Sequence, residues 1–250
     1  MAGHSHWAGI KYKKALADSR KGKVFSKIAK RLTMAAKTAG GDPDTNLELR
    51  YAIDEAKSAN MPKDNIERAI NKGLGNIEGA SYEAVVYEGY GPGGVAIMVE
   101  ALTDNRNRTA SEIRKIFERN GGNLGDTGCV AWMFERKGMV TVQAAEDDEE
   151  QLMLAVMEAG ALDMERINDI YEIATEVSSL HDVKAAIEEA GFAVGKAEIQ
   201  HIPRNTIDLG ADDGRRILRL VEALDDQDDT ESVSANFNVP DEVMAEVAEG

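Results

Sequence analysis

The charge of this 250-residue chain changes sign near residue 75, and its hydrophobic pattern changes at the same place. Residues 1–75 carry 15 basic and 8 acidic side chains, a net charge of +7, whereas residues 76–250 carry a net charge of −23. Before the change, apolar residues recur at the three- and four-residue spacing of amphipathic helices; after it, runs typical of strands begin at Tyr82. We therefore predict a basic helical domain followed by acidic domains of mixed helix and strand.

Three short amphipathic helices are expected in the basic part of the chain. The first is expected to end at Gly40, because glycine readily adopts the left-handed conformation that closes a helix. Asp42 and Pro43 are expected to open the second helix, as its cap and its first-turn residue. Pro62 ends that helix and a third follows. Three such helices can bury their apolar faces against one another as a small bundle.

Two α+β domains are expected after the bundle. Two strands joined by a glycine-rich turn, a helix and a third strand at about residues 130–136 come first. Lys137 and Gly138 are expected to break that third strand, and the next segment has the βαββαβ order of ferredoxin-like domains. A helix and a strand are left over after residue 204. They would complete the earlier domain, so the βαββαβ segment is predicted to be inserted in it.

The predicted fold is therefore α+β, with an N-terminal three-helix domain and two ferredoxin-like α+β domains, one inserted in the other. A chain of this length, with 43% hydrophobic and 30% charged residues, can bury a core in each domain. The expected boundaries are residues 1–21 for a basic N-terminal arm, 22–78 for the helical bundle domain, 79–137 with 205–240 for the discontinuous α+β domain, 138–204 for the inserted ferredoxin-like domain and 241–250 for a C-terminal tail.

The first 37 residues contain ten basic side chains and one acidic side chain, a net charge of +9. A cationic arm on an acidic body attracts polyanions, and nucleic acid is the commonest polyanion in a cell. Aromatic rings among the cations can stack on unpaired bases while the cations hold phosphates. The alternative is a solvated basic tail with no binding function. The residues predicted to bind nucleic acid here are Trp7, Lys11, Tyr12, Lys13, Lys14, Arg20, Lys21, Lys23, Lys27, Lys30 and Arg31.

Arg106 and Arg108 are predicted as secondary nucleic-acid contacts. They precede a helix that Thr109 and Glu112 are expected to open as a capping box. Free backbone N–H groups and the helix dipole favour an anion at such a position. An ordinary polar loop that caps a helix is the alternative interpretation.

Other motifs are interpreted as structural. A strand follows the glycines at 89–94, so they indicate a hairpin turn and not a phosphate-binding loop. His4 and His6 have no further ligands nearby, so no metal site is expected. The acidic runs at 146–150 and 225–229 are most simply solvated, although they could contact a basic protein.

The sequence shows no recognisable set of catalytic residues. We therefore expect that the protein is not an enzyme and that it has no small-molecule substrate and no cofactor. The single cysteine, Cys129, excludes an internal disulfide and is typical of a reducing compartment. No apolar run is long enough to span a bilayer, and the N-terminus lacks the apolar core of a signal peptide. These features favour a cytoplasmic protein that does not bind membranes.

Four long motifs resemble the YebC family, whose mitochondrial relatives are translational activators of cytochrome c oxidase. The motifs are AGHSHWAGIKYKKALADSRKGKVFSKIAK, NMPKDNIERAI, YEGYGPGGVAIMVEALTDNRNRTASEIR and GGNLG followed by VAWMFERKG. The resemblance covers residues 2 to about 240, with Cys129 where a serine is expected. It implies three domains, one helical and two α+β, and no enzymatic activity.

The resemblance leaves the nucleic-acid target open between DNA and ribosomal RNA. Family members are commonly described as DNA-binding transcriptional regulators, whereas the mitochondrial members act on translation. Residues 76–250, with a net charge of −23, would be repelled by a long duplex that lay against them. A basic arm that reaches alone into a crevice of folded RNA would avoid that repulsion. We expect a nucleic-acid-binding regulator of gene expression, with a ribosome-associated translation factor as the alternative and a protein-interaction adaptor as a further alternative.

Overall fold

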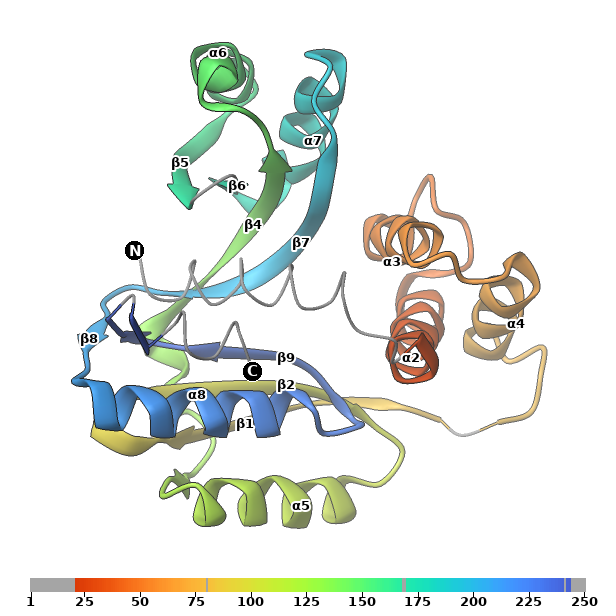
Figure 1. Ribbon diagram of the computed structural model, residues 1–250. Coiled ribbons are helices and arrows are strands. Elements are labelled where there is room, and N and C mark those ends of the chain that lie inside the picture. Colours follow the sequence, from red (N-terminus) through yellow and green to blue (C-terminus); the bar gives the residue numbers. More distant parts are fainter. Residues whose placement is uncertain (1–20, 80, 168–169, 241, 244–250) are drawn as a thin grey trace. The chain divides into compact units, whose positions relative to one another are not determined.

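The computed structural model describes residues 21–79, 81–167, 170–240 and 242–243. These residues form two compact units. One contains residues 21–130 and 215–233, and the other contains residues 131–214 and 234–243. The first unit holds the helical domain and one four-stranded sheet, and the second holds the other four-stranded sheet (Figure 1). The predicted α+β class with an N-terminal helical domain is confirmed.

Three helices form the N-terminal domain: α2 (Lys21–Ala39), α3 (Leu47–Ser58) and α4 (Lys63–Gly73). Their apolar faces share one core, in which Leu32, Leu49 and Ala56 are fully buried. Gly73 lies where α4 passes the backbone of α2, and a Cβ atom there would overlap the carbonyl oxygen of Thr33. The bundle therefore depends on a close helix approach as well as on its hydrophobic pattern.

The second helix begins later than the sequence predicted. Asp42 and Pro43 lie in a turn, where the Asp42 carboxylate accepts a hydrogen bond from the Asp44 amide. The cap of α3 is Asn46, whose side chain accepts from the Leu49 amide at 3.1 Å. The Asn46 side-chain amide also donates to the carbonyl groups of Ala35 and Gly40, which satisfies the C-terminal end of α2. One buried side chain thus serves two helix ends, which local spacing cannot reveal.

The sheet of the first unit has the order β3-β1-β2-β9. The glycine-rich segment is a hairpin turn, as predicted: Tyr90 pairs with Ala96, and Gly93 and Gly94 both have positive φ angles. Helices α5 and α8 cover one face of this sheet (Figure 1). The elements are β1 (Glu83–Tyr90), β2 (Ala96–Thr103), α5 (Arg106–Arg119), β3 (Asn123–Leu124), α8 (Ala211–Asp225) and β9 (Thr230–Ala235).

The predicted third strand and the predicted break after it are both wrong. The third strand of this sheet is β3, which lies before the residues predicted to form it. Residues 134–143 form one continuous strand, β4 (Phe134–Gln143), through Lys137 and Gly138. Gly138 is needed in the strand because a Cβ atom there would overlap Thr175 and come within 2.9 Å of Leu180. A glycine required by packing was interpreted as a glycine that ends a strand.

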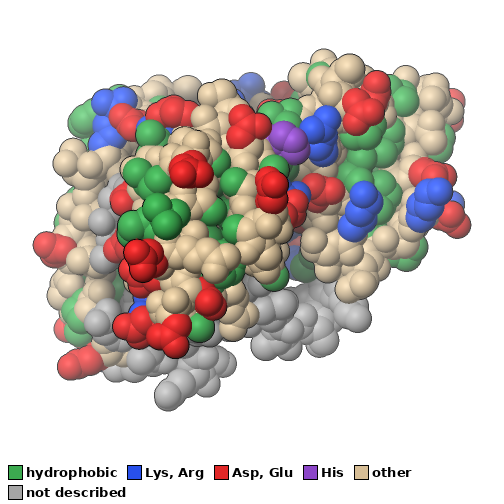
Figure 2. Space-filling view, turned by 90° about the horizontal axis from the view of Figure 1, so that it is seen from above, with side chains coloured by type: hydrophobic (Ala, Val, Ile, Leu, Met, Phe, Trp, Pro, Cys, Tyr) green, Lys and Arg blue, Asp and Glu red, His purple; other side chains and the backbone are tan. Residues whose placement is uncertain are grey.

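The other sheet has the order β5-β6-β4-β7, which together with the element order βαββαβ is the ferredoxin-like arrangement. Helices α6 and α7 lie side by side over one face, and acidic side chains are spread over their outer surface (Figures 1 and 2). The elements after β4 are α6 (Glu149–Glu158), β5 (Ala161–Ile167), β6 (Ile170–Thr175), α7 (Leu180–Glu189) and β7 (Val194–Pro203); β8 (Ile207–Asp208) then pairs with β10 (Phe237–Asn238).

The two sheets differ in strand order because the two domains begin differently. The βαββαβ domain begins with a strand followed by a helix, so its second strand pairs away from its first. The other domain begins with the β1–β2 hairpin, which makes its first two strands neighbours. Both domains are α+β, and the ferredoxin-like strand order belongs to the βαββαβ domain.

We propose that β4 to β7 form an inserted domain whose ends are adjacent. Phe134 pairs with Pro203, and the Arg204 amide donates to the Met133 carbonyl at 2.9 Å. Excising residues 134–203 and joining Met133 to Arg204 through two glycines should therefore leave a folded remainder, since closing so short a gap costs little. Circular dichroism during urea unfolding should show one cooperative transition. A remainder without such a transition would contradict the insertion.

Candidate nucleic-acid interface

Helix α2 has one apolar face and one basic face, as its sequence predicted. Ile28, Leu32 and Ala36 are buried in the bundle core. Lys23, Lys27, Lys30 and Arg31 are the predicted binding residues on the basic face, and Lys21 begins the helix. The predicted binding residues Trp7, Lys11, Tyr12, Lys13, Lys14 and Arg20 lie outside the described residues.

The basic face of α2 contacts residues 225–231, here called the acidic segment. This segment begins at the last residue of α8 and contains five acidic side chains in seven residues. Lys23 lies 3.4 Å from the Asp228 carboxylate. Lys27 donates to the Asp225 carbonyl at 2.7 Å. Arg31 pairs with Glu231 at 3.1 Å. The cations that the sequence assigned to phosphate are thus engaged by acidic groups and carbonyl oxygens of the same chain.

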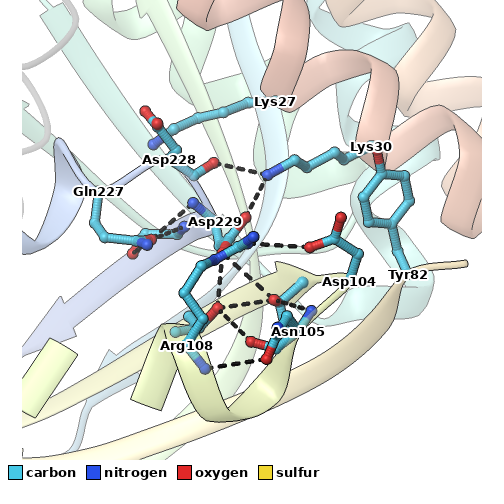
Figure 3. A network of polar contacts seen from close by, with 12 residues as sticks. Lys27, Lys30, Tyr82, Asp104, Asn105, Arg108, Gln227, Asp228 and Asp229 are labelled. Carbon is cyan, nitrogen blue, oxygen red and sulfur yellow. Dashed lines mark hydrogen bonds and ion pairs between the residues drawn. The ribbon is translucent and has the colours of Figure 1, made fainter. Parts of the chain in front are cut away.

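Asp229 is the centre of this network (Figure 3). Its side chain is only 5% exposed. One carboxylate oxygen accepts from the Lys30 ammonium at 2.7 Å, and the other accepts from Arg108 at 2.6 Å and from the Thr109 hydroxyl at 2.7 Å. Burial opposes ionisation, but these three donors outweigh it and hold the pKa of Asp229 well below its usual range. Asp229 is therefore an ionised, fully coordinated carboxylate.

The predicted anion site before α5 holds this internal carboxylate. Helix α5 begins at Arg106, and its cap is Asn105, whose side chain accepts from the Arg108 amide at 3.1 Å. The capping box expected at Thr109 is wrong, because Thr109 is buried in the first turn and donates to Asp229. Arg108 also pairs with Asp104 at 3.0 Å. Arg106 stays exposed, so only Arg108 of the two predicted arginines joins the network.

A cavity of about 610 Å³ lies beside the network. Its lining mixes cations such as Lys23 with carboxylates such as Glu112, and Tyr82 adds an aromatic ring beneath the Lys30 and Lys72 ammonium groups. Charges of both signs lie close together there, so no single sign of ligand charge is favoured. The cavity does not define a ligand.

Glu88 and Cys129 have a structural role in the loop around residues 128–130. The buried Glu88 carboxylate accepts from the backbone amides of Gly128 at 2.6 Å and Val130 at 2.8 Å. Burial, with a contribution from Glu88, raises the pKa of the Cys129 thiol above its ordinary value. A thiol that stays protonated is a poor nucleophile. This pair therefore stabilises a loop and offers no reactive group.

Two other kinds of site are absent from the described part of the chain. No group of three or more His, Cys, Asp or Glu side chains there is placed to hold a metal ion. No described helix has the length and apolar character needed to cross a bilayer. The charged side chains of α2, α5 and the acidic segment form an extended polar network among these residues.

The fold and the charge arrangement define a class of protein in which a basic helical domain is joined to acidic α+β domains. Two family models identify the class more closely: one described as the TACO1/YebC protein N-terminal domain matches residues 5–76, and one described as the TACO1/YebC second and third domain matches residues 82–237. The chain belongs to the TACO1/YebC family. The resemblance seen in its motifs is confirmed.

Several relatives are similar over nearly their whole length. One from Pelotomaculum thermopropionicum is 52% identical over 96% of this chain and 100% of its own, and one from Dictyoglomus thermophilum is 51% identical over 98% of both chains. Both are named "Probable transcriptional regulatory protein". A crystal structure of a conserved hypothetical protein from Aquifex aeolicus is 45% identical, with a TM-score of 0.84 over 89% of this chain and 92% of that one.

The role of the acidic segment was missed from the sequence. Its acidic run was interpreted as solvated, whereas Asp229 is buried and Glu231 has a side chain only 9% exposed. The acidic segment has five acids and no cation, and α2 has four cations on one face, so their complementary charge was visible. Their sequence separation of about 200 residues left nothing to indicate that the two segments meet.

Proposed function

We propose that the chain is a non-enzymatic, cytoplasmic regulator of gene expression that binds nucleic acid through residues 1–21. The observation that carries this proposal is the division of charge in the first 37 residues. The cations of α2 are engaged by the acidic segment, which anchors the helix to its own domain. The cations that precede α2 have only one acidic residue, Asp18, among them in the sequence. The names of the relatives support a regulatory role.

Within this proposal, the arm contacts phosphate and α2 fixes the arm to the body. The body is strongly acidic, so a long duplex lying against it would be repelled. An arm that inserts alone into folded or single-stranded RNA avoids the repulsion, and aromatic residues suit unpaired bases. The observations therefore favour RNA and a ribosome-associated role, with duplex DNA and transcription as the second candidate that the relatives' names support.

The double variant Trp7→Ala with Tyr12→Ala separates these two targets. It keeps every charge, so the salt dependence of binding should not change. Affinity for single-stranded RNA should fall by about 1–3 kcal/mol for each stacked ring, and affinity for duplex DNA should fall much less. Fluorescence anisotropy with both probes measures the difference. Equal, small losses on both probes would reject stacking and favour the transcriptional role.

A protein-interaction adaptor is the third candidate, because an arm of this charge can also bind an acidic protein. The chain can be purified from cells before and after complete nuclease digestion to test this. Under the nucleic-acid proposal, partners should be lost on digestion, and the recovered nucleic acid should identify the target after crosslinking and sequencing. Partners that survive digestion would favour the adaptor.

A further inference from the structure

Helix α6 of the inserted domain exposes large apolar side chains on the face that points away from its sheet. Met153, Leu154 and Met157 are 43%, 61% and 53% exposed. Their spacing places them on one side of the helix, while Leu152 and Val156 are fully buried on the other. Figure 2 shows apolar side chains gathered over this part of the domain with acidic side chains around them. Large apolar groups clustered in this way on a soluble domain mark an interaction surface.

The surroundings of this surface carry one sign of charge. Residues 144–165 contain eight acidic residues and no lysine or arginine, and the next residue, Arg166, pairs with Glu146 at 2.9 Å. Glu150 and Glu158 are exposed within one turn of Leu154 on the same helix. The neighbouring helix α7 adds exposed Asp182, Glu188 and Glu189, and its one cation, Lys184, lies 3.9 Å from Glu188. Acids still outnumber cations on both helices, so the apolar side chains are rimmed by an excess of negative charge.

This combination selects the chemistry of a partner. Methionine is flexible and polarizable, so a methionine-rich surface can adapt to different apolar side chains. An acidic rim attracts a cationic partner and repels nucleic acid, anionic lipid and an identical acidic surface of a second copy. An amphipathic helix with lysine or arginine beside its apolar stripe meets both requirements, because its apolar face can cover α6 while its cations reach the rim.

We propose that this surface, formed by Met153, Leu154 and Met157 with Glu150 and Glu158, binds a basic amphipathic helix of another protein. The inference concerns a different domain from the arm and does not rest on the proposed function. It gives the acidic inserted domain a binding role of its own.

A defined probe tests the proposal with the full chain. The probe is an 18-residue peptide with leucine on one helical face and lysine on the other. A leucine/glutamate peptide of the same pattern is its control. Isothermal titration calorimetry should show binding of the lysine peptide only, and hydrogen exchange should show protection of residues 149–158. The triple variant Met153→Ser, Leu154→Ser, Met157→Ser should weaken binding at least tenfold.

Two further variants keep the test decisive. Ile77→Ser with Val86→Ser removes exposed apolar side chains elsewhere and should leave binding unchanged. Glu150→Lys with Glu158→Lys keeps the apolar residues and should also weaken binding at least tenfold, which tests the rim even if the triple variant does not fold. Equal binding by the wild type and both α6 variants would overturn the proposal. So would a dimer, or adsorption to phosphatidylglycerol vesicles, that the triple variant loses.

Discussion

Replacing Asp229 with asparagine should lower the free energy of unfolding by about 3 kcal/mol or more, which is the usual effect of removing one partner from a buried ion pair. Lys30 is only 12% exposed, so its ammonium group would lose its charged partner without gaining water. Arg108 and Thr109 would lose an acceptor of full charge at the same time. Urea unfolding followed by circular dichroism measures this change.

Asp228→Asn is the matched control for Asp229→Asn. Asp228 is the adjacent acid and pairs with Lys23 at 3.4 Å, but its side chain is 79% exposed. An exposed pair contributes about 0–1 kcal/mol, so this variant should unfold almost as the wild type does. Similar losses for the two variants would show that the network stabilises the fold through its total charge and not through the buried carboxylate.

Lowering the pH should remove the contribution of the Asp229 carboxylate to the stability of the wild-type protein. The folded pKa of Asp229 lies below its unfolded value of about 3.9. The carboxylate therefore contributes its full stability above that unfolded value, and the contribution is lost as the pH falls towards the folded pKa. In Asp229→Asn this part of the acid dependence should be absent, so the wild-type and variant stabilities should converge below about pH 4.

Deleting residues 1–21 should abolish most of the salt dependence of nucleic-acid binding. If about six cations of the N-terminal segment meet phosphates, log K for single strands falls against log salt with a slope near −4, at about 0.7 per contact. The deletion removes Lys11, Lys13, Lys14, Arg20 and Lys21 together with both rings. The slope should therefore flatten by about 3.5 units if all five contact phosphate. Filter binding at several salt concentrations measures both slopes.

Lys23→Gln with Lys27→Gln is the matched control for the arm deletion. These two cations already contact the acidic segment, so their loss should change the slope by much less than the deletion does. The thermal stability of the deleted protein should stay close to that of the wild type, since terminal residues make few packed contacts. An unchanged slope after deletion would show that residues 1–21 do not carry the affinity.

Local sequence determined much of this fold. The three amphipathic helices, the glycine-rich hairpin and the βαββαβ order depend on residue spacing and turn chemistry within short segments, so they could be predicted. The uneven distribution of charge could also be read from the sequence, and the proposed function rests on it. Family motifs added the expectation of three domains, one helical and two α+β. The structure confirms the fold class, a helical domain followed by α+β structure.

Tertiary structure alone decided the features that depend on distant partners. Gly138 continues a strand because Thr175 and Leu180 leave no space for a side chain, and Thr109 lies inside a helix because Asp229 accepts its hydrogen bond. The apolar residues of α6 were visible, but only packing shows that Leu154 faces outward. The partners of α2 lie about 200 residues along the chain, and pairing over such separations leaves no periodic signal in a sequence.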